Sequence, residues 1–139
     1  MKIVTERLKK QTSGAGDLQD ITAEITEAFG KTGLTQGLVN IFVVGSTAAI
    51  TDFEYEPGLT DDIRALYERI APRGKHYRHD DTWNDANGFS HVRAALQGPG
   101  LAVPFENNRL LLGTWQQIVL AEFDTRPRKR EIILTFIGE

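Results

Sequence analysis

The chain contains no cysteine among its 139 residues. This absence excludes disulfide bonds, a thiolate nucleophile and a cysteine-based zinc site, so stability must come from the hydrophobic core. No apolar run approaches the roughly 18 residues that span a bilayer. The charged segment 1–10 is also not followed by the apolar stretch of a signal peptide. We therefore expect a cytoplasmic protein that does not bind to or cross a membrane.

The chain also lacks a strong excess of charge of either sign. Its formal net charge is -3, from 16 Lys and Arg against 19 Asp and Glu. This balance provides no basic field that would attract nucleic acid, so nucleic acid is not an expected partner. The basic run at 126–130 is typical of a solvated turn between strands.

The remaining composition is that of an ordinary globular protein, with 40% hydrophobic and 25% charged residues. A chain of this length can bury one sizeable core. The sequence has no internal repeat and no linker. We therefore predict a single domain spanning residues 1–139.

Extended segments dominate the pattern of side chains. Runs of β-branched and alternating apolar residues, separated by turn residues, predict seven strands. They cover residues 3–11, 38–44, 48–55, 101–105, 109–114, 117–123 and 131–137. Segment 38–44 is almost wholly apolar, which predicts a central strand covered on both faces. The Asn107-Asn108 step is typical of a hairpin turn.

Two longer helices and one short helix are predicted between the strands. The first begins after an N-cap at Asp17 and ends at Gly30, and the second follows a cap at Thr60 and ends before Pro72. The third follows a cap at Ser90. Their predicted buried positions follow helical spacing: Leu18, Ile21, Ile25, Ala28 and Phe29; Leu59, Ile63, Leu66, Tyr67 and Ile70; Val92, Ala95 and Leu96. Together with the strands they predict an α+β fold with a mostly antiparallel sheet or sandwich.

Groups suited to a chemical site are concentrated in segment 76–98. It holds all three histidines together with carboxylates and amides: His76, His79, His91, Asp80, Asp81, Asp85, Asn84 and Asn87. Histidine titrates near neutral pH and is a common ligand of divalent metals. The same composition is also typical of a polar loop whose Asn, Asp and Gly residues form turns while its histidines face water. Both interpretations remain open on composition alone.

Two short segments have the features of an anion or ligand site. If a helix starts at Ser90, its first turn presents the backbone N–H of His91, and Gly88 would let a phosphate or carboxylate approach the backbone. Ser46 and Thr47 follow a buried strand, where their hydroxyls could bind a ligand. A simple turn is the alternative at that position. The segment lacks the pattern of a nucleophilic serine.

Four motifs taken together resemble the YjbQ-like family, described as secondary thiamine-phosphate synthases. They are Gly45-Ser46-Thr47-Ala48-Ala49-Ile50, Tyr77 with His79-Asp80, Ser90-His91-Val92-Arg93-Ala94, and Gly113-Thr114-Trp115-Gln116. The segment LLLGTWQQIVLAEFDTRPRKREI at 110–132 is also typical of that family. The resemblance spans essentially the whole chain. It implies a small α+β domain with a sandwich-like sheet, a homotrimer, and a polar pocket near the subunit boundaries.

The resemblance also implies the residues of the pocket. His79, Asp80 and His91 match the positions expected to line it; our hypothesis is that these three are the catalytic residues and that His79 and His91 hold a divalent metal such as Mg²⁺ or Zn²⁺. Thr114 and Gln116 match the Gly-Thr-Trp-Gln motif near the pocket, and with Ser46, Thr47, Asn87 and Arg93 they are the residues that we expect to bind the substrate. Trp115 is predicted to be a packing residue.

The chain departs from the family pattern at three positions. Gly45, Asn84 and Phe89 stand where family members often have histidine. Phe89 cannot bind a metal, and asparagine is a poor replacement for an imidazole. A metal site that needs four imidazoles is thus excluded. A metal site made of His79, His91, a carboxylate and water is still possible. This requires the two imidazoles to face one shared cavity.

The activity attached to the family joins an aminopyrimidine methyl diphosphate to a thiazole phosphate and releases diphosphate. Our hypothesis is that the start of the Ser90 helix and Arg93 bind phosphate, Asp80 holds a metal, and His79 orients or protonates the leaving group. A metal-dependent hydrolase and a non-catalytic binding protein for a phosphorylated metabolite are the alternatives. In each case the expected partner is a small phosphorylated metabolite.

Overall fold

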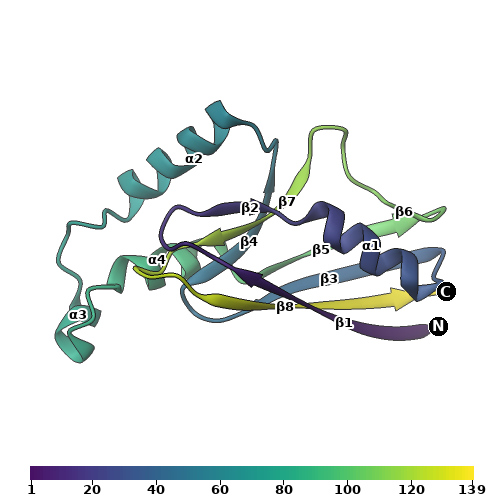
Figure 1. The fold of residues 1–139 in the computed structure, drawn as a ribbon, viewed down its shortest axis with the longest axis horizontal. Helices are drawn as coiled ribbons and strands as arrows, with labels where there is room; N and C mark the ends of the chain where they lie inside the picture. The colour runs from purple at the N-terminus through teal and green to yellow at the C-terminus, as the bar shows by residue number, and fades with distance from the viewer.

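A computed structural model describes all 139 residues (Figure 1). The strands form two antiparallel sheets, one of five strands in the order β1-β8-β3-β5-β6 and one of three in the order β2-β7-β4. The predicted α+β fold with antiparallel sheets is confirmed. The elements are β1 (Lys2–Gln11), β2 (Leu18–Asp20), α1 (Thr22–Thr32), β3 (Gln36–Val44), β4 (Ala48–Phe53), α2 (Pro57–Ile70), α3 (Arg78–Trp83), α4 (Gly88–Gln97), β5 (Gly100–Glu106), β6 (Arg109–Leu110), β7 (Gln117–Glu122) and β8 (Lys129–Gly138).

The three-stranded sheet is the middle layer of the molecule. Ile118 and Leu120 of β7 pack toward the five-stranded sheet and α1, within the larger hydrophobic core. Val119 and Ala121, which alternate with them, pack on the other side beside Tyr67 of α2 and other residues of a second core. Because every second side chain of a strand points to the opposite face, one strand supports both cores. No helix has the length and apolar content needed to cross a membrane.

The five-stranded sheet is covered on one face only. Along β3, Val39, Ile41 and Val43 are buried, whereas Phe42 and Val44 are exposed by 42% and 49%. The prediction that this strand is covered on both faces is therefore wrong for a single chain. The apolar residues of β3 lie on both faces of the sheet, but other parts of the chain cover only one of these faces.

The first helix begins later than predicted. Leu18 to Asp20 form β2, which pairs with β7 through the register Leu18 to Ala121. Helix α1 starts at Thr22, whose N–H and hydroxyl donate to the Asp20 carboxylate at 2.9 and 2.6 Å. It passes Gly30 and ends before Gly33, which has φ 70°. Strand pairing with a distant segment overrides the local helical periodicity at this end.

The second helix also begins earlier than predicted. Pro57 opens α2, and the Glu56 carboxylate accepts hydrogen bonds from the first N–H groups of the helix. Thr60 lies inside the helix, and its hydroxyl donates to the Pro57 carbonyl at 2.9 Å. Tyr67 is buried, but Leu66 and Ile70 are exposed by 46% and 51%, so the predicted stripe is only partly covered.

Helix α4 buries the face opposite to the predicted one. Its buried residues include Phe89, Ser90, Arg93 and Ala94, while the predicted apolar face of Val92, Ala95 and Leu96 is exposed.

Two further elements differ from the prediction. Residues 78–83 form the short helix α3, and the predicted strand 109–114 is ordered only as the two-residue β6.

Candidate functional site

Two helices bring His79 and His91 together. His79 lies on α3 and His91 on α4, and their ring centroids are 4.3 Å apart with 37° between the ring planes. The two imidazoles therefore share one location within a single chain. The third histidine, His76, is exposed and pairs with Asp81 at 3.2 Å, away from this pair.

Asp80 fixes α3 against the start of α4. Its Oδ1 accepts a hydrogen bond from the backbone N–H of Gly88 at 2.9 Å, and its Oδ2 accepts one from Tyr77 at 3.3 Å. A Cβ at Gly88 would lie 2.5 Å from the Tyr77 Cβ, so only glycine permits this approach. The start of α4, where we expected a bound phosphate or carboxylate ligand, is thus occupied by the side-chain carboxylate of Asp80.

The predicted cap at Ser90 is wrong, and this changes the anion site expected there. Helix α4 starts at Gly88, and the backbone N–H groups of Ser90 and His91 both donate to the Asn87 carbonyl, at 2.9 and 3.3 Å. The Ser90 hydroxyl donates to the Phe123 carbonyl at 2.5 Å. These donors are used inside the fold, so they do not present an open site for phosphate.

The Nδ1 atom of His79 is buried and has no hydrogen-bond partner. It lies 3.5 Å from Asp85 Oδ1 and 3.9 Å from Asp80 Oδ1. Ligand atoms of His79, Asp80 and Asp85 all lie within 4.8 Å of one another, a donor set that fits a divalent cation. An unpaired buried polar atom is costly, and a proton shared with Asp85 or a bound cation would satisfy it.

His91 contributes a neutral imidazole. Removal from water lowers its pKa below the ordinary value, and the neighbouring His79 lowers it further, while Asp85 and Asp124 oppose the shift. His91 is therefore uncharged at neutral pH and can accept a proton or a hydrogen bond. It lines a hollow of about 180 Å³ together with Gly45, Ser46, Ala48, Ala94, Ala95 and Pro99.

Three of the predicted substrate-binding residues lie near the histidines. Ser46 is exposed on the wall of the His91 hollow. Thr47 is buried, and its hydroxyl donates to Asp124 at 3.0 Å and accepts from Arg130 at 2.7 Å. With its side-chain nitrogen toward Asp85, Asn87 donates to the two oxygens of that carboxylate at 2.9 and 3.1 Å. Asn87 thereby positions Asp85 beside His79.

Arg93 has a structural position. Its Nε donates to the Ala71 carbonyl at 3.0 Å and its Nη2 to Glu68 at 2.7 Å, and its guanidinium lies 4.8 Å from the Phe89 ring centroid. The side chain is buried under α2. Its donors stabilise the packing of α2 on α4, which leaves it poorly placed to bind phosphate beside His91.

The loop between β6 and β7 lies far from α3 in the folded chain (Figure 1). It carries Thr114 and Gln116, so a single chain does not bring these two residues to the histidines. Gln116 donates to Asp52 at 3.0 Å and accepts from the Gly113 N–H at 3.1 Å. Trp115 is exposed by 70%, so within a single chain the predicted packing role is wrong.

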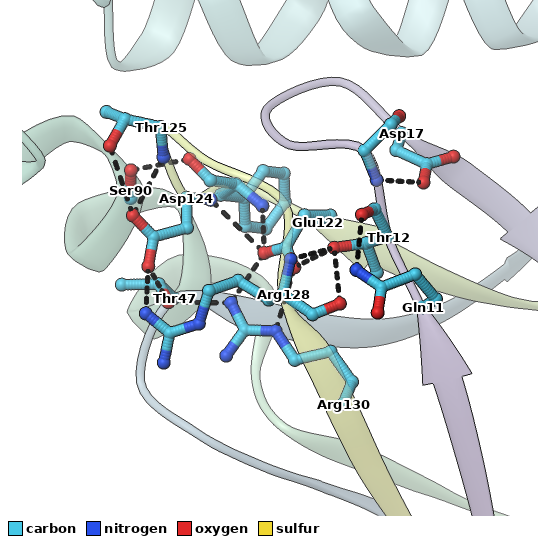
Figure 2. Close-up of polar contacts among 12 residues, drawn as sticks. Gln11, Thr12, Asp17, Thr47, Ser90, Glu122, Asp124, Thr125, Arg128 and Arg130 are labelled. Carbon is cyan, nitrogen blue, oxygen red and sulfur yellow. Dashed lines mark hydrogen bonds and ion pairs between the residues drawn. The ribbon is translucent and has the colours of Figure 1, made fainter.

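A buried ion pair beside the site was not predicted. Glu122 is fully buried, and it accepts hydrogen bonds from Arg130 Nε at 2.8 Å, from Arg130 Nη2 at 2.5 Å and from the Thr12 hydroxyl at 2.6 Å (Figure 2). The interpretation of Arg130 as part of a solvated turn is therefore wrong. The signal was present in the alternation of β8, since Arg130 shares its face with the buried Ile132 and Leu134.

Asp124 extends this pair toward the histidines. Its carboxylate accepts hydrogen bonds from the Thr125 N–H at 2.7 Å, from Thr47 and from Arg128 Nη1 at 2.8 Å. Burial alone would raise the pKa of Asp124, but these hydrogen bonds and the Arg128 charge outweigh it, so the pKa lies below its ordinary value. Asp124 is therefore ionised at neutral pH.

The sequence and the fold of the chain resemble those of known proteins. The model of the family described as UPF0047 protein YjbQ-like matches residues 6–139. The chain belongs to this family. A UPF0047 protein of Methanothermobacter thermautotrophicus is 37% identical over 139 residues, covering 100% of this chain and 95% of the relative. The UPF0047 protein YugU of Bacillus subtilis is 32% identical over 133 residues, covering 94% and 97%.

Solved structures have the same fold. A crystal structure from Sulfolobus solfataricus, described as a YbjQ-like protein of unknown function, matches with a TM-score of 0.88 at 30% identity, covering 99% of this chain and all of that one. A YjbQ/UPF0047 protein of Clostridium acetobutylicum matches with a TM-score of 0.80, also at 30% identity, covering 96% and 99%.

The positions at which this YjbQ-like chain lacks histidine have structural roles. Phe89 is 1% exposed and packs beneath the Arg93 guanidinium. Asn84 ends α3 in the left-handed conformation at φ 54°, and its N–H donates to the Asp80 carbonyl. Gly45 leaves room for Arg130, because a Cβ there would lie 2.7 Å from Arg130 Nη1.

Proposed function

We propose that this protein is a small-molecule enzyme in which His79 and His91 are the reactive groups, and that its substrate is a phosphorylated metabolite. The observation that carries the proposal is the close imidazole pair, in which the Nδ1 of His79 is buried without a partner beside Asp85. Buried polar groups in proteins are otherwise nearly all paired, and exceptions concentrate at functional sites.

The reaction we propose is the transfer that the family resemblance implies, as a weak or side activity. The thiazole nitrogen attacks the methylene carbon of the aminopyrimidine diphosphate, the carbon–oxygen bond breaks, and the electron pair leaves with diphosphate. Protonated His79, stabilised by Asp85 at 3.5 Å, donates a proton to the leaving oxygen. Neutral His91 orients the substrate by accepting a hydrogen bond. Asp80 positions α3 and α4 through its bonds to backbone N–H groups.

In a metal-bound form His79 would be neutral instead of protonated, and with Asp80 and Asp85 it would hold a divalent cation in place of the proton, because a nitrogen and carboxylate oxygens suit Mg²⁺ or Zn²⁺. When bound, the cation would neutralise charge on the departing diphosphate.

Turnover with defined variants tests this function. Purified protein with both substrates and Mg²⁺ should form thiamine phosphate, and His79→Ala and His91→Ala should each reduce the rate by about 100-fold, as expected for loss of a general acid or base. The matched control is His76→Ala, which removes the exposed histidine outside the pair. Equal rates in the wild type, His79→Ala and His91→Ala would refute the proposal.

A metal-dependent hydrolase is the second candidate, and the donor set of His79, Asp80 and Asp85 favours it. Metal analysis of protein purified without an affinity tag, followed by a panel of phosphoesters and amides, separates this activity from the transferase. Metal-dependent cleavage without formation of thiamine phosphate would assign the hydrolase. Thermal stabilisation by a phosphorylated metabolite without any turnover would instead assign a binding protein.

We also propose that the protein forms the homotrimer implied by the family resemblance, using the outer face of the five-stranded sheet. The strand register places Ile3, Ile137 and Leu38 in one row across β1, β8 and β3, with Phe42 further along. Leu38 and Phe42 are 40% and 42% exposed, and contiguous apolar patches of this kind mark interfaces. Light scattering should give three times the chain mass, Phe42→Glu should lower it, and Ala23→Glu on the exposed side of α1 should not.

A further inference from the structure

The Arg130 guanidinium retains one free nitrogen. Nε and Nη2 donate to Glu122, and Nη2 also reaches the Thr47 hydroxyl. Nη1 has no acceptor in the protein and lies against Gly45, where a Cβ would come within 2.7 Å of it. The Arg130 side chain is only 3% exposed, so the surrounding residues fix its orientation.

Arg128 presents a second guanidinium beside the first. Its Nη1 donates to Asp124, which also accepts from Thr47, and Thr47 in turn accepts from Arg130. Figure 2 shows that the nitrogens of Arg128 and Arg130 without a dashed line point to the same side of Thr47. Guanidinium groups that are already held by carboxylates lose little freedom when they bind an anion.

The turn between β3 and β4 adds backbone donors at the same place. The N–H groups of Gly45, Ser46 and Thr47 have no acceptor in the protein. Gly45 has φ 148°, and consecutive free N–H groups in a turn form a concavity that suits an anion. Gly45 and Ser46 also line the hollow that contains His91, so this turn connects the guanidiniums with the imidazole pair.

We propose that the Gly45–Thr47 turn and the free nitrogens of Arg128 and Arg130 bind the phosphate or diphosphate group of the substrate. This inference rests on the proposed function, because it places the anion in the hollow of His91. This site takes the phosphate-binding role that we predicted from the sequence for Arg93 and the start of α4. The donors of those two groups already bind acceptors within the protein. A second hollow, lined by Arg130 together with Lys9, Lys10, Lys129 and Glu131, carries an excess of positive charge.

Binding of inorganic diphosphate to the full chain tests the assignment without any need for turnover. Titration calorimetry should show that Arg128→Gln weakens diphosphate binding about tenfold or more, because a charge-assisted hydrogen bond is lost. Ser46→Asp should weaken it at least as much, since it places a negative charge on the turn. The matched control is Arg126→Gln, which removes the same charge from an exposed neighbour in the same turn and should change affinity by no more than about twofold.

The design separates folding, anion binding and turnover. Arg128→Gln and Ser46→Asp both leave the Arg130–Glu122 pair intact, and Ser46 is exposed, so a thermal melt should show a folded protein in at least one of them. His79→Ala and His91→Ala should keep diphosphate affinity within about threefold while losing turnover. Equal affinity in the wild type, Arg128→Gln and Ser46→Asp, or no binding by the wild type, would overturn the inference. Normal diphosphate binding without turnover would refute the proposed function alone.

Discussion

The ion pair of Arg130 with Glu122 and the imidazole pair of His79 with His91 lie in one region but differ in how their polar atoms are satisfied. Both oxygens of Glu122 accept hydrogen bonds from Arg130 and from neighbouring groups. At the imidazole pair, by contrast, Nδ1 of His79 has no partner. A fully satisfied buried network stabilises one conformation, whereas a partly satisfied one is a place where a ligand can bind. The contrast assigns stability to the Glu122 carboxylate and the groups that donate to it, leaves Arg130 Nη1 without an acceptor, and supports the chemistry proposed for the imidazole pair.

The two clusters are also assembled from different parts of the chain. Arg130 and Glu122 belong to β8 and β7 of different sheets, and Thr12 follows β1, so this network joins distant segments (Figure 2). The imidazoles come from the consecutive helices α3 and α4 at one corner of the molecule (Figure 1). Removing a member of the network should therefore weaken the whole fold, while removing an imidazole should have a local effect.

Glu122→Gln should give the largest effect on stability. It leaves the buried Arg130 charge without a carboxylate, which we expect to lower the free energy of unfolding by about 3–5 kcal/mol. Urea unfolding at a fixed protein concentration measures the change. The control is Glu54→Gln at an exposed position, where a change within about 0.5 kcal/mol is expected. A loss below about 1 kcal/mol in Glu122→Gln would remove the distinction between the two clusters.

Asp85→Asn should instead affect metal binding and leave stability nearly unchanged. Asp85 lies 3.5 Å from the unpaired nitrogen of His79, and loss of its charge should weaken Zn²⁺ binding by at least about tenfold. Calorimetry after treatment with a chelator measures the affinity. Asp81→Asn, which alters the carboxylate beside His76, is the matched control. Equal affinities in the two variants would exclude Asp85 as a ligand.

Asp80→Ala should have an intermediate effect, because Asp80 belongs to the fold and to the site. Its carboxylate accepts hydrogen bonds from the N–H groups of Tyr77 and Gly88. Loss of this capping should cost about 1 kcal/mol in the free energy of unfolding, measured with urea. Asp80→Asn, which keeps one acceptor oxygen, should recover part of that loss. If both substitutions left stability unchanged, Asp80 would not position α3 and α4.

The smallest expected effect is a pH dependence from His91. Its pKa in the folded protein lies below the ordinary value of 6.5, because burial and His79 disfavour the charged form. The unfolded chain therefore takes up a proton first as the pH falls, so stability at this site decreases below pH 6.5. Urea midpoints between about pH 7 and pH 5 should fall more steeply in the wild type than in His91→Asn. Parallel curves would show that His91 does not have a lowered pKa.

Local sequence patterns predicted much of the fold. The alternation in β7 and β8 and the turn at Asn107-Asn108 follow from the spacing of side chains. The start of α1 could not be predicted from local spacing, because residues 18–20 pair with β7, which is about 100 residues away in sequence. The buried face of α4 was also unpredictable from hydrophobicity, since it includes Ser90 and Arg93, whose polar groups find partners only in the folded chain.

The candidate site was predicted in outline but not in detail. The concentration of histidines and carboxylates in 76–98 indicated the imidazole pair, because α3 and α4 are near neighbours in sequence. The contribution of Arg128 was hidden, since an arginine in a basic run looks the same whether it faces water or a carboxylate. For Arg130 the alternation of β8 was the available signal, and the pairing of β8 with its neighbours shows that its face is the buried one.

The carboxylate of Asp80 at the start of α4 has a consequence for the direction from which a substrate can enter. An incoming anion would meet like charge at that helix tip, and so its approach there is disfavoured. On the Gly45–Thr47 side the Asp124 carboxylate is paired with Arg128 at 2.8 Å, so its negative charge is compensated. A molecule that enters with its anionic end toward this turn would have its other end directed at the imidazoles. The negative charge at the start of α4 would therefore select the orientation in which the substrate binds.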